Sequence, residues 1–524
     1  MAAEVGATVA GVGRPSAAYA AELAARVAST TGERASASSP LDDRVLAEIP
    51  QSSERDVEEA FAQARRAQVA WAAVPATERA AVLLRFHDLV LEHHDELETL
   101  LSWESGKARK DAFDEVAHVA LVARYYGRRG PGQLRSKRRL GLFPGLTRVD
   151  VHRVPKGVVG VISPWNFPLT MTMSDALPAL LAGNAVVAKP DAQTMLVNLL
   201  GVTLLERAGL PPGLWQTVAG PGAEVGPAMI ARADYVSFTG STVTGRAIAR
   251  ACADRLIGCS LELGGKNPLL ILRDADLERA AEAAVRGCFA NAGQLCVAME
   301  RMYVADQVYD RFLDRVVART EALTLGASTD WENDVGPLAS HAQLSRVSAH
   351  VEDAVARGAV VRAGGRARPD LAPTFYEPTI LEGVSPGMAC FAEETFGPVV
   401  SAYRFHDEAE AVARANEGAY GLNASVFSRD AARARALARR LHCGTVNVNE
   451  AYGASFGSID APMGGMGDSG MGRRQGSEGL HRYTELQSVA TQRGLSLGYP
   501  GGSAATYRRM MGATLRAQHR LRRP

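Results

Sequence analysis

The chain has 524 residues, a length that suits two or three packed lobes better than one small binding module. Its 58 basic and 57 acidic side chains nearly cancel, so no global charge draws it to nucleic acid or anionic lipid. It has no apolar run as long as a membrane span, no secretory-signal pattern, and six sparse cysteines without the C-x-x-C spacing of zinc sites or the pairing of disulfide frameworks. We therefore expect a cytoplasmic enzyme without a bound metal or a nucleic-acid partner.

The first predicted elements are helices. Residues 1–38 are rich in Ala, Gly and Ser and are expected to form a flexible lead-in. Apolar residues then recur at helical spacing over Glu54–Trp71 and Thr77–Gly106, which predicts two long amphipathic helices. Val151–Ile162 is dense in Val and ends at Ser163-Pro164, a pattern typical of a strand followed by a turn.

Strands and helices alternate through the rest of the chain. A first stretch runs from about residue 185 to residue 253, and a second from Leu261 to about Asn449. In each stretch short apolar runs are followed by longer segments of helical period. Such alternation predicts a parallel sheet in each of two α/β lobes.

Two segments have residue types suited to binding an anion. Phe238–Gly245 combines a strand end, a glycine-flanked polar turn and a helix start, where free N–H groups can hold a phosphate. An ordinary capped turn is the alternative. In Ser163–Pro168, Asn166 stands between two prolines and can donate to a developing oxyanion, although a rigid aromatic turn explains that segment equally well.

Two further residues are candidates for the chemistry itself. Glu262 lies between two leucines, where partial desolvation would raise its pKa and suit it to act as a general base. Cys296 follows a glycine-containing turn, where it can be exposed to substrate and activated as a thiolate by neighbouring dipoles. Taken singly, a structural ion pair and a core cysteine are the alternatives.

The order of these four segments, with Glu262 placed 34 residues before Cys296, resembles the aldehyde dehydrogenase superfamily. The resemblance extends over residues 40–495. Further matching motifs are Gly183-Asn184-Ala185, Lys189-Pro190, Glu394-Thr395-Phe396-Gly397-Pro398, Tyr420-Gly421-Leu422, Gly464-Gly465 and Ser469-Gly470.

The resemblance implies an aldehyde dehydrogenase-like α/β fold with a Rossmann-type cofactor lobe, an α/β catalytic lobe and a small β extension for oligomerisation. After the lead-in of residues 1–38, the implied parts are a cofactor-binding domain over 39–262 with the β extension at 135–155, a catalytic domain over 263–460, a return to the cofactor lobe with an oligomerisation strand over 461–495, and a basic tail over 496–524. By analogy the protein is expected to be a homodimer or homotetramer.

The resemblance also implies a reaction, the oxidation of an aldehyde to a carboxylate. Cys296 would attack the aldehyde carbon, Asn166 and the Cys296 N–H would hold the oxyanion, and Glu262 would activate the water that hydrolyses the thioester. The presence of Glu262 favours hydrolysis over transfer to coenzyme A. The expected cofactor contacts are Ser163, Trp165, Lys189, Ala192, Gly240, Ser241, Gly245, Leu263, Glu394 and Phe396.

The cofactor preference is expected to depend on Ala192. NAD-preferring relatives usually have a Glu at this place, which binds the ribose hydroxyls and repels a 2′-phosphate. Without it Lys189 could pair with the extra phosphate, so NADP+ is expected to be accepted and preferred, with NAD+ as the alternative. The direction of the neighbouring Asp191 carboxylate is left open by the sequence.

The sequence is most similar to a bacterial subgroup labelled succinate-semialdehyde dehydrogenase. Characterised semialdehyde enzymes clamp the distal carboxylate with two arginines, at the places of Ser174 and Ala290 here, and with a serine that corresponds to Ser458. The substrate is therefore expected to be succinic semialdehyde. The alternatives are a broad-range enzyme for less charged aldehydes and, more distantly, a non-catalytic binding or scaffold protein with the same fold. The expected pocket residues are Ser174, Ala290, Leu295 and Ser458.

Two departures from the family pattern remain. Ala298 stands where the family has a second, redox-switch cysteine, so that regulation is expected to be absent. From Tyr507 onward the chain has six arginines and no acid, with apolar residues at helical spacing. We expect this tail to pack on the oligomer or to stay disordered, and contact with a membrane surface is the less favoured alternative.

Overall fold

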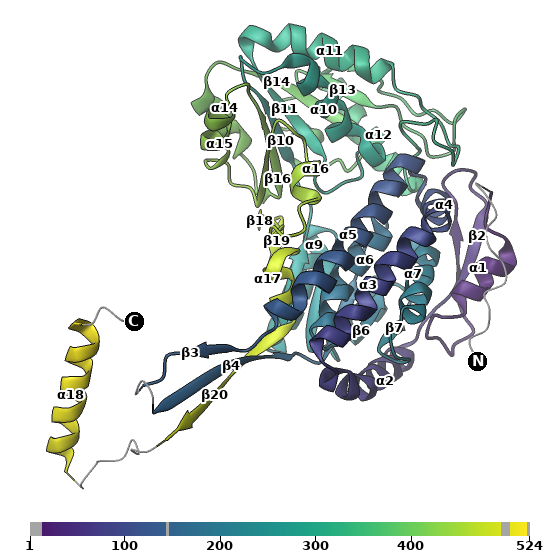
Figure 1. The fold of residues 1–524 in the computed structure, drawn as a ribbon. Coiled ribbons are helices and arrows are strands. Elements are labelled where there is room, and N and C mark those ends of the chain that lie inside the picture. The colour runs from purple at the N-terminus through teal and green to yellow at the C-terminus, as the bar shows by residue number, and fades with distance from the viewer. Residues whose placement is uncertain (1–12, 143–145, 494–502, 521–524) are drawn as a thin grey trace. The chain divides into compact units, whose positions relative to one another are not determined.

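The computed structural model describes residues 13–142, 146–493 and 503–520, and its ribbon is drawn in Figure 1. The chain divides into two compact units, Met1–Gln133 with Pro155–Tyr483, and Leu134–Val154 with Thr484–Pro524. Across the described ranges, no helix is both long enough and apolar enough to cross a membrane.

The N-terminal segment is folded from Ala17 onward. Helix α1 (Ala17–Ala24) is capped by the Ser16 side chain and buries Tyr19 and Leu23. Strand β1 (Arg34–Ser38) pairs antiparallel with β2 (Val45–Pro50). The prediction of a flexible lead-in is therefore wrong for residues 17–38, because buried side chains and strand pairing fix this stretch. Residues 1–12 lie outside the described residues.

The long helices that follow are set by local capping signals. Helix α2 (Glu54–Ala73) begins with a capping box, in which Ser53 and Asp56 each bind the other's backbone N–H. The single helix predicted over Thr77–Gly106 is in fact two, α3 (Ala76–Glu92) and α4 (His94–Ser105), because His93 leaves the helical conformation between them. Helix α5 spans Arg109–Gln133.

The first large sheet has six strands in the order β19-β9-β8-β5-β6-β7. Strands β5 to β9 pair in parallel, and β19 joins the edge antiparallel. Strands β6 and β7 follow β5 on one side of it, and β8 and β9, which come later in the chain, lie on the other side of β5. In open α/β sheets ligands bind beyond the carboxyl ends of the strands, beside such a reversal. The strands are β5 (Val158–Ile162), β6 (Ala185–Lys189), β7 (Trp215–Thr217), β8 (Tyr235–Thr239), β9 (Gly258–Glu262) and β19 (Gly470–Met471).

Helices pack against this sheet. α3, α5, α6 and α7 lie side by side in front of it (Figure 1), and α2 packs on β5, β6 and β7. The connecting helices are α6 (Pro168–Leu181), the 3-10 turn η1 (Ala192–Thr194), α7 (Met195–Arg207), α8 (Gly222–Ile230) and α9 (Thr242–Asp254).

The second large sheet has seven strands in the order β12-β13-β14-β11-β10-β16-β17, all parallel except β12. Its strands are β10 (Asn267–Ile271), β11 (Met299–Ala305), β12 (Val360–Ala363), β13 (Thr379–Glu382), β14 (Val399–Phe405), β16 (Asn423–Phe427) and β17 (Thr445–Val448). The remaining elements of this unit are α10 (Leu277–Phe289), η2 (Ala290–Gly293), η3 (Asp306–Val308), α11 (Tyr309–Glu321), α12 (His341–Ala356), α13 (Ala389–Ala392), α14 (Glu408–Ala415), β15 (Tyr420–Gly421), α15 (Ala431–Ala438), α16 (Gly453–Phe456), β18 (Met466–Gly467) and α17 (Gly476–His481). The two predicted parallel sheets are confirmed.

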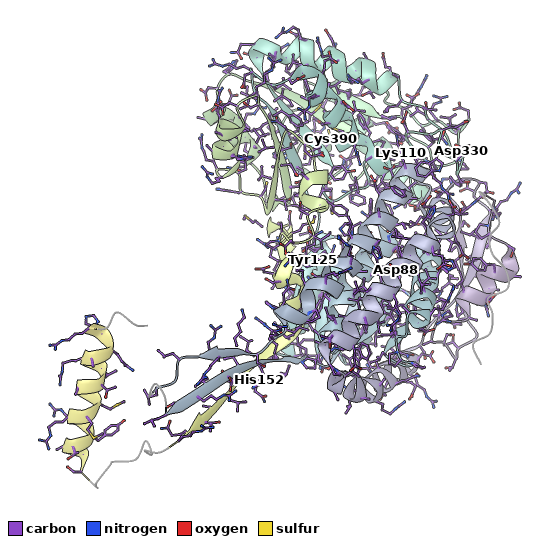
Figure 2. The ribbon with its side chains drawn as sticks, in the orientation of Figure 1. Asp88, Lys110, Tyr125, His152, Asp330 and Cys390 are labelled. Carbon is purple, nitrogen blue, oxygen red and sulfur yellow. The ribbon has the colours of Figure 1, made fainter. Side chains whose placement is uncertain are left out.

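The strand predicted over Val151–Ile162 is also two strands, because Pro155 lacks an N–H and Gly157 has a φ of 131°. Its first half is β4 (Thr147–Pro155), which joins β3 (Lys137–Arg139) and β20 (Thr484–Gln492) in a three-stranded sheet of the second unit. His152 on β4, labelled in Figure 2, lies 2.7 Å from the Ser136 hydroxyl. Helix α18 (Ala504–Arg520) ends this unit and has no buried residue.

Candidate active site

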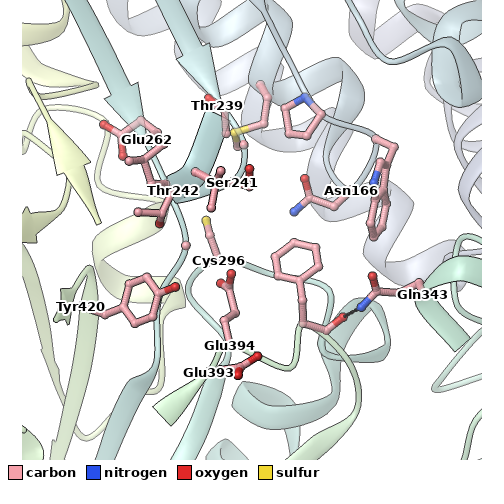
Figure 3. A pocket seen from close by; sticks show the side chains of 18 of the residues that line it. Asn166, Thr239, Ser241, Thr242, Glu262, Cys296, Gln343, Glu393, Glu394 and Tyr420 are labelled. Carbon is pink, nitrogen blue, oxygen red and sulfur yellow. Dashed lines mark hydrogen bonds between the residues drawn. The ribbon is translucent and has the colours of Figure 1, made fainter. Parts of the chain in front are cut away.

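A cavity of about 450 Å³ lies at the carboxyl ends of β8 and β9, in the position where the strand order predicts a ligand. Asn166, Glu262 and Cys296 all line it, although they come from three separate segments of the chain. Figure 3 shows the three side chains around the same hollow. The convergence predicted from the sequence order is therefore present in the structure.

Cys296 follows a strained turn. Asn291 and Ala292 have φ values of 51° and 52°, and Gly293 has 70°. A left-handed conformation is costly for residues with a side chain, so surrounding contacts must hold it. Asp111 supplies one of them, since its carboxylate accepts from the Asn291 N–H over 2.9 Å, and the Asn267 amide donates to the Cys296 oxygen over 2.8 Å. The turn thus presents the thiol to the cavity in a fixed position.

The environment of Cys296 raises the pKa of its thiol. Burial raises the pKa of Cys296 to about 12, and the nearby carboxylates of Glu394 and Glu262 act in the same direction. Desolvation outweighs the favourable charge of Arg474, so activation of the thiol as a thiolate stays a prediction. Nucleophilic attack requires the thiol to lose its proton first.

Glu262 is the candidate general base on the wall of the cavity. It ends β9, is 7% exposed, and its Oε1 atom has no hydrogen-bond partner among the described residues. Burial raises the pKa of Glu262 to about 7, which matches the sequence-based expectation. A carboxyl group with a pKa near neutrality can both accept and release a proton at physiological pH.

Asn166 is held beside the thiol by a hydrogen-bond network. Its side-chain amide donates to the Gln294 oxygen over 2.9 Å, and its own backbone oxygen accepts from Lys107 over 2.8 Å. Lys107 is fully buried and forms a 2.5 Å ion pair with Glu115. This buried pair fixes the loop that carries the amide.

The loop that contains Glu394 and Phe396 borders the cavity opposite Glu262. Buried Glu300 accepts hydrogen bonds from the Thr395 and Phe396 N–H groups and forms an ion pair with Lys266. Phe396 has a φ of 56°, another strained position. Burial, with the Glu300 charge, raises the pKa of Glu394 to about 8.

The expected cofactor residues fall into two groups. Six line the cavity, and they are Trp165, Gly240, Ser241, Leu263, Glu394 and Phe396. The other four do not line it, and they are Ser163, Lys189, Ala192 and Gly245. Ser241 caps α9 by accepting from the Thr244 N–H, and a Cβ on Gly245 would meet Leu263 at 2.5 Å. Glycine at this position therefore lets α9 pack against the start of the Leu263 segment.

The structure around Lys189 shows the direction of the Asp191 carboxylate, which the sequence left open. Within the described part of the chain the Lys189 ammonium has no hydrogen-bond or ion-pair partner, and burial lowers its pKa. Asp191 caps the following 3-10 turn, where its Oδ1 accepts from the Gln193 N–H over 3.0 Å. Ala192 begins that turn and contributes no charge.

The four expected pocket residues do not line the catalytic cavity. Ser174 is buried on α6, and its hydroxyl lacks a partner among the described residues. Ala290 borders a second cavity of about 440 Å³, and Leu295 is buried next to Cys296. Ser458 is exposed, and its hydroxyl donates to the Ala454 oxygen. Here the structure differs from the expectation, because Ser458 bonds within its own turn.

Three residues that sequence reasoning missed lie close to this site. Lys107 supports the Asn166 loop, as described above. Arg474 donates to Asp175 from both Nε and Nη2, over 3.0 and 2.8 Å, although the two are 299 residues apart. The only sequence signal was Asp175 itself, a single charge within the apolar helix α6.

Comparisons with known proteins agree with this geometry. The sequence profile of the Aldehyde dehydrogenase family matches residues 27–489. A protein of Mycolicibacterium smegmatis with the provisional name succinate-semialdehyde dehydrogenase, NADP(+), is 50% identical over 479 residues, which are 91% of this chain and 93% of that protein. A 4,4'-diapolycopene aldehyde oxidase of Methylomonas sp is 39% identical over 459 residues, 87% of this chain and 85% of that one.

A solved structure agrees as well. The crystal structure of an E. coli NADP dependent enzyme matches with a TM-score of 0.85 and 35% identity, and the match covers 89% of this chain and 96% of that one. With the profile spanning most of the sequence and relatives at this level of identity, the chain belongs to the aldehyde dehydrogenase family.

Proposed function

We propose that this chain oxidises succinic semialdehyde to succinate through a thioester on Cys296, with NADP+ as the hydride acceptor. The observation that carries the proposal is the cavity shared by a thiol, an amide and a carboxyl group that ends a buried strand. Each of these groups has a separate task in the oxidation of an aldehyde by a covalent route.

In the first half of the reaction, the Cys296 thiol gives its proton to water, and the sulfur attacks the aldehyde carbon. The negative oxygen of the thiohemiacetal then accepts hydrogen bonds from the Asn166 amide and the Cys296 N–H. The C–H bond breaks with loss of hydride, which leaves a thioester. The nicotinamide cofactor supplies the hydride acceptor when it is bound.

In the second half, ionised Glu262 takes a proton from a water molecule. The resulting hydroxide attacks the thioester carbon, the carbon–sulfur bond breaks, and the sulfur leaves as thiolate. Glu262 suits this step because its pKa of about 7 leaves a large ionised fraction at neutral pH.

The start of α9 and Lys189 support a dinucleotide cofactor. Ser241 and the first turn of α9 border the cavity and offer a helix N-terminus to a pyrophosphate. Lys189 has an unpartnered ammonium, and no carboxylate occupies position 192. Asp191 uses one oxygen on the backbone of its own turn. We infer a preference for NADP+ from this, in keeping with the names of the M. smegmatis and E. coli proteins.

The substrate assignment has one rival. Succinic semialdehyde comes from the name of the M. smegmatis relative, and the unpartnered Ser174 hydroxyl offers one polar contact. A less charged aldehyde is favoured by the neutral residues Ser174 and Ala290 and by the name of the Methylomonas relative. The ratio of kcat/KM for succinic semialdehyde to that for butanal decides between them. A clear preference for the acid supports the first substrate, and equal values contradict it.

The nucleophile is tested by Cys296→Ser, with Cys443→Ser as the matched control. Cys443 is a buried cysteine of the same unit and does not line the cavity. NADPH absorbance should show loss of turnover in the first variant and near-normal turnover in the second. Unchanged turnover in Cys296→Ser contradicts the proposed chemistry.

We propose further that the three-stranded sheet of the second unit mediates a homodimer or homotetramer. Leu140, Leu486 and Val489 in or beside its strands are 62%, 63% and 47% exposed, and such apolar surface usually marks an interface. Helix α18, with Met510 and Leu515 exposed, is proposed to pack on that assembly. Sedimentation of Leu486→Asp and of a chain ending at Gln492 tests both ideas, since each variant should shift to smaller species.

The six cysteines are all unpaired, which supports the proposal of a reducing, cytoplasmic location. The two sheets support the domain boundaries proposed from the sequence. Strands β5 to β9 end at Glu262 and strands β10 to β17 occupy residues 267–448, while β19 returns to the first sheet.

A further inference from the structure

A buried cluster of charges lies directly behind Glu262. Asp175 accepts hydrogen bonds from Arg474 and from Arg482, and all three side chains are less than a tenth exposed. Two guanidinium groups therefore share one carboxylate. One positive charge is left over in a place where charge is costly unless it is paired.

The strand register puts Arg474 next to the base. Thr239 and Glu262 are paired positions on the neighbouring parallel strands β8 and β9, so their side chains point to the same face of the sheet. Arg474 Nη2 donates to the Thr239 hydroxyl over 2.8 Å, and Nη1 lies 2.8 Å from the Met171 sulfur. Thr239, Met171 and Glu262 all line the catalytic cavity.

The backbone of Arg474 is fixed as firmly as its side chain. Its N–H and C=O form reciprocal hydrogen bonds with Met463, over 2.6 and 2.7 Å. Asp175 is held in turn by the Ser237 hydroxyl over 2.7 Å. The guanidinium group therefore cannot move away from the cavity wall without breaking several buried contacts.

We propose that Arg474, clamped by Asp175, is a positioning residue that keeps Glu262 in its charged, proton-accepting form. The negative charge of Glu262 would offset the excess positive charge of the cluster through space, since no ion pair within the described ranges joins Glu262 to either arginine. This proposal rests on the role of Glu262 as base, and it assigns a function to a pair that does not itself touch the substrate.

The direction of the effect follows from the charges that face Glu262. Burial raises its pKa, Arg474, Arg482 and Arg473 lower it, and Asp175 raises it. On the cavity side Glu262 and Cys296 interact, and Glu394 faces the same thiol. Tyr235 and Tyr483 adjoin Arg482 and stay neutral, because burial raises the pKa of each hydroxyl.

Two variants of the Arg474–Asp175 pair should shift the pKa of Glu262 in opposite directions. Arg474→Gln removes a positive charge, so the pKa of Glu262 rises and thioester hydrolysis needs a higher pH. Asp175→Asn removes a negative charge, so the pKa falls and hydrolysis persists to lower pH. General damage to the fold would not produce opposite shifts.

The measurement is the decay of the acyl adduct on Cys296. The enzyme is mixed with NADP+ and one equivalent of succinic semialdehyde, quenched at intervals over a range of pH, and analysed by mass spectrometry. Arg474→Gln should slow the decay about fivefold at pH 7 and up to about tenfold at lower pH, the effect on the ionised fraction of a rise of one unit in a pKa of about 7. Its decay should approach the wild-type rate in alkaline solution, and Arg474→Lys should restore most of the loss.

Arg473→Gln is the matched control. This neighbouring arginine is half-buried and donates only to the backbone oxygens of Gly465 and Gly472, so water should screen the loss of its charge. The midpoint of its pH profile should shift less than that of Arg474→Gln. Thermal melting of all variants checks that they are folded.

Two results overturn the proposal. One is an Arg474→Gln profile with its midpoint at the wild-type pH, and the other is a shift of Asp175→Asn in the same direction as Arg474→Gln. Glu262→Gln separates this failure from a failure of the proposed function. If the adduct of Glu262→Gln on Cys296 decays at the wild-type rate, Glu262 is not the base and the proposed function fails. If that adduct persists while the Arg474 variants behave like the wild type, only the role of Arg474 is wrong.

Discussion

The side-chain amide of Asn166 donates a 2.9 Å hydrogen bond to the backbone oxygen of Gln294, two residues before the Cys296 thiol. One of the two N–H groups of this amide is therefore engaged, and the other is left to donate to the proposed oxyanion during the reaction. That bond should be strong, because a hydrogen bond to a charged acceptor is stronger than one to a neutral carbonyl.

Asn166→Ala should lower kcat by about 100-fold to 1000-fold, the usual cost of losing one oxyanion donor. The KM for the aldehyde should change little, because the interaction forms only when the oxygen becomes negative. Steady-state kinetics of the wild type and the variant check this. A drop of kcat by less than a few-fold would mean that the amide has only a structural role.

The raised pKa of Cys296 predicts slow alkylation at neutral pH. The rate of modification by iodoacetamide, measured by mass spectrometry on the cofactor-free protein, should climb through the alkaline range as the thiol ionises. Glu262→Gln should alkylate faster than the wild type at the same pH, because its negative charge no longer raises the thiol pKa. Slower alkylation in this variant would show that Glu262 activates the thiol.

The buried pair of Lys107 and Glu115 predicts a stability difference between single and double variants. Lys107→Met leaves the Glu115 carboxyl without its counter-charge, which should cost about 3–5 kcal/mol of folding free energy. The double variant Lys107→Met with Glu115→Leu should recover much of that loss. Urea denaturation of the three proteins provides the comparison, and equal losses in both variants would contradict it.

Ala192→Glu should reverse the cofactor preference. A carboxylate near the adenosine ribose would repel a 2′-phosphate and compete for Lys189, so kcat/KM with NADP+ should fall at least about tenfold relative to NAD+. Ala192→Gln, which has the same shape without the charge, is the control. Equal changes in both variants would show that volume rather than charge sets the preference.

Most of what the sequence could predict about the site came from local motifs. Glu262 and Cys296 were recognisable because each sits in a short segment whose chemistry depends on its immediate neighbours, and the alternating elements predicted both parallel sheets. The Arg474–Asp175 pair was not predictable, because its two members are 299 residues apart and only folding brings them together.

The predicted boundaries of helices and strands were wrong where one or two residues change the direction of the backbone. His93 divides one predicted helix into α3 and α4, and Pro155 with Gly157 divides one predicted strand into β4 and β5. Helix α1 was missed because its alanine-rich sequence has little helical period, and its stability comes from the burial of Tyr19 and Leu23. These outcomes depend on tertiary packing, which a periodicity pattern does not contain.

The most direct test of the account is a single turnover of Glu262→Gln with NADP+ and succinic semialdehyde. One NADPH per active site should form without further turnover, and peptide mass spectrometry should find the acyl group on Cys296. Continued turnover, or an acyl group on another residue, would contradict the claim that these side chains act on one carbonyl carbon.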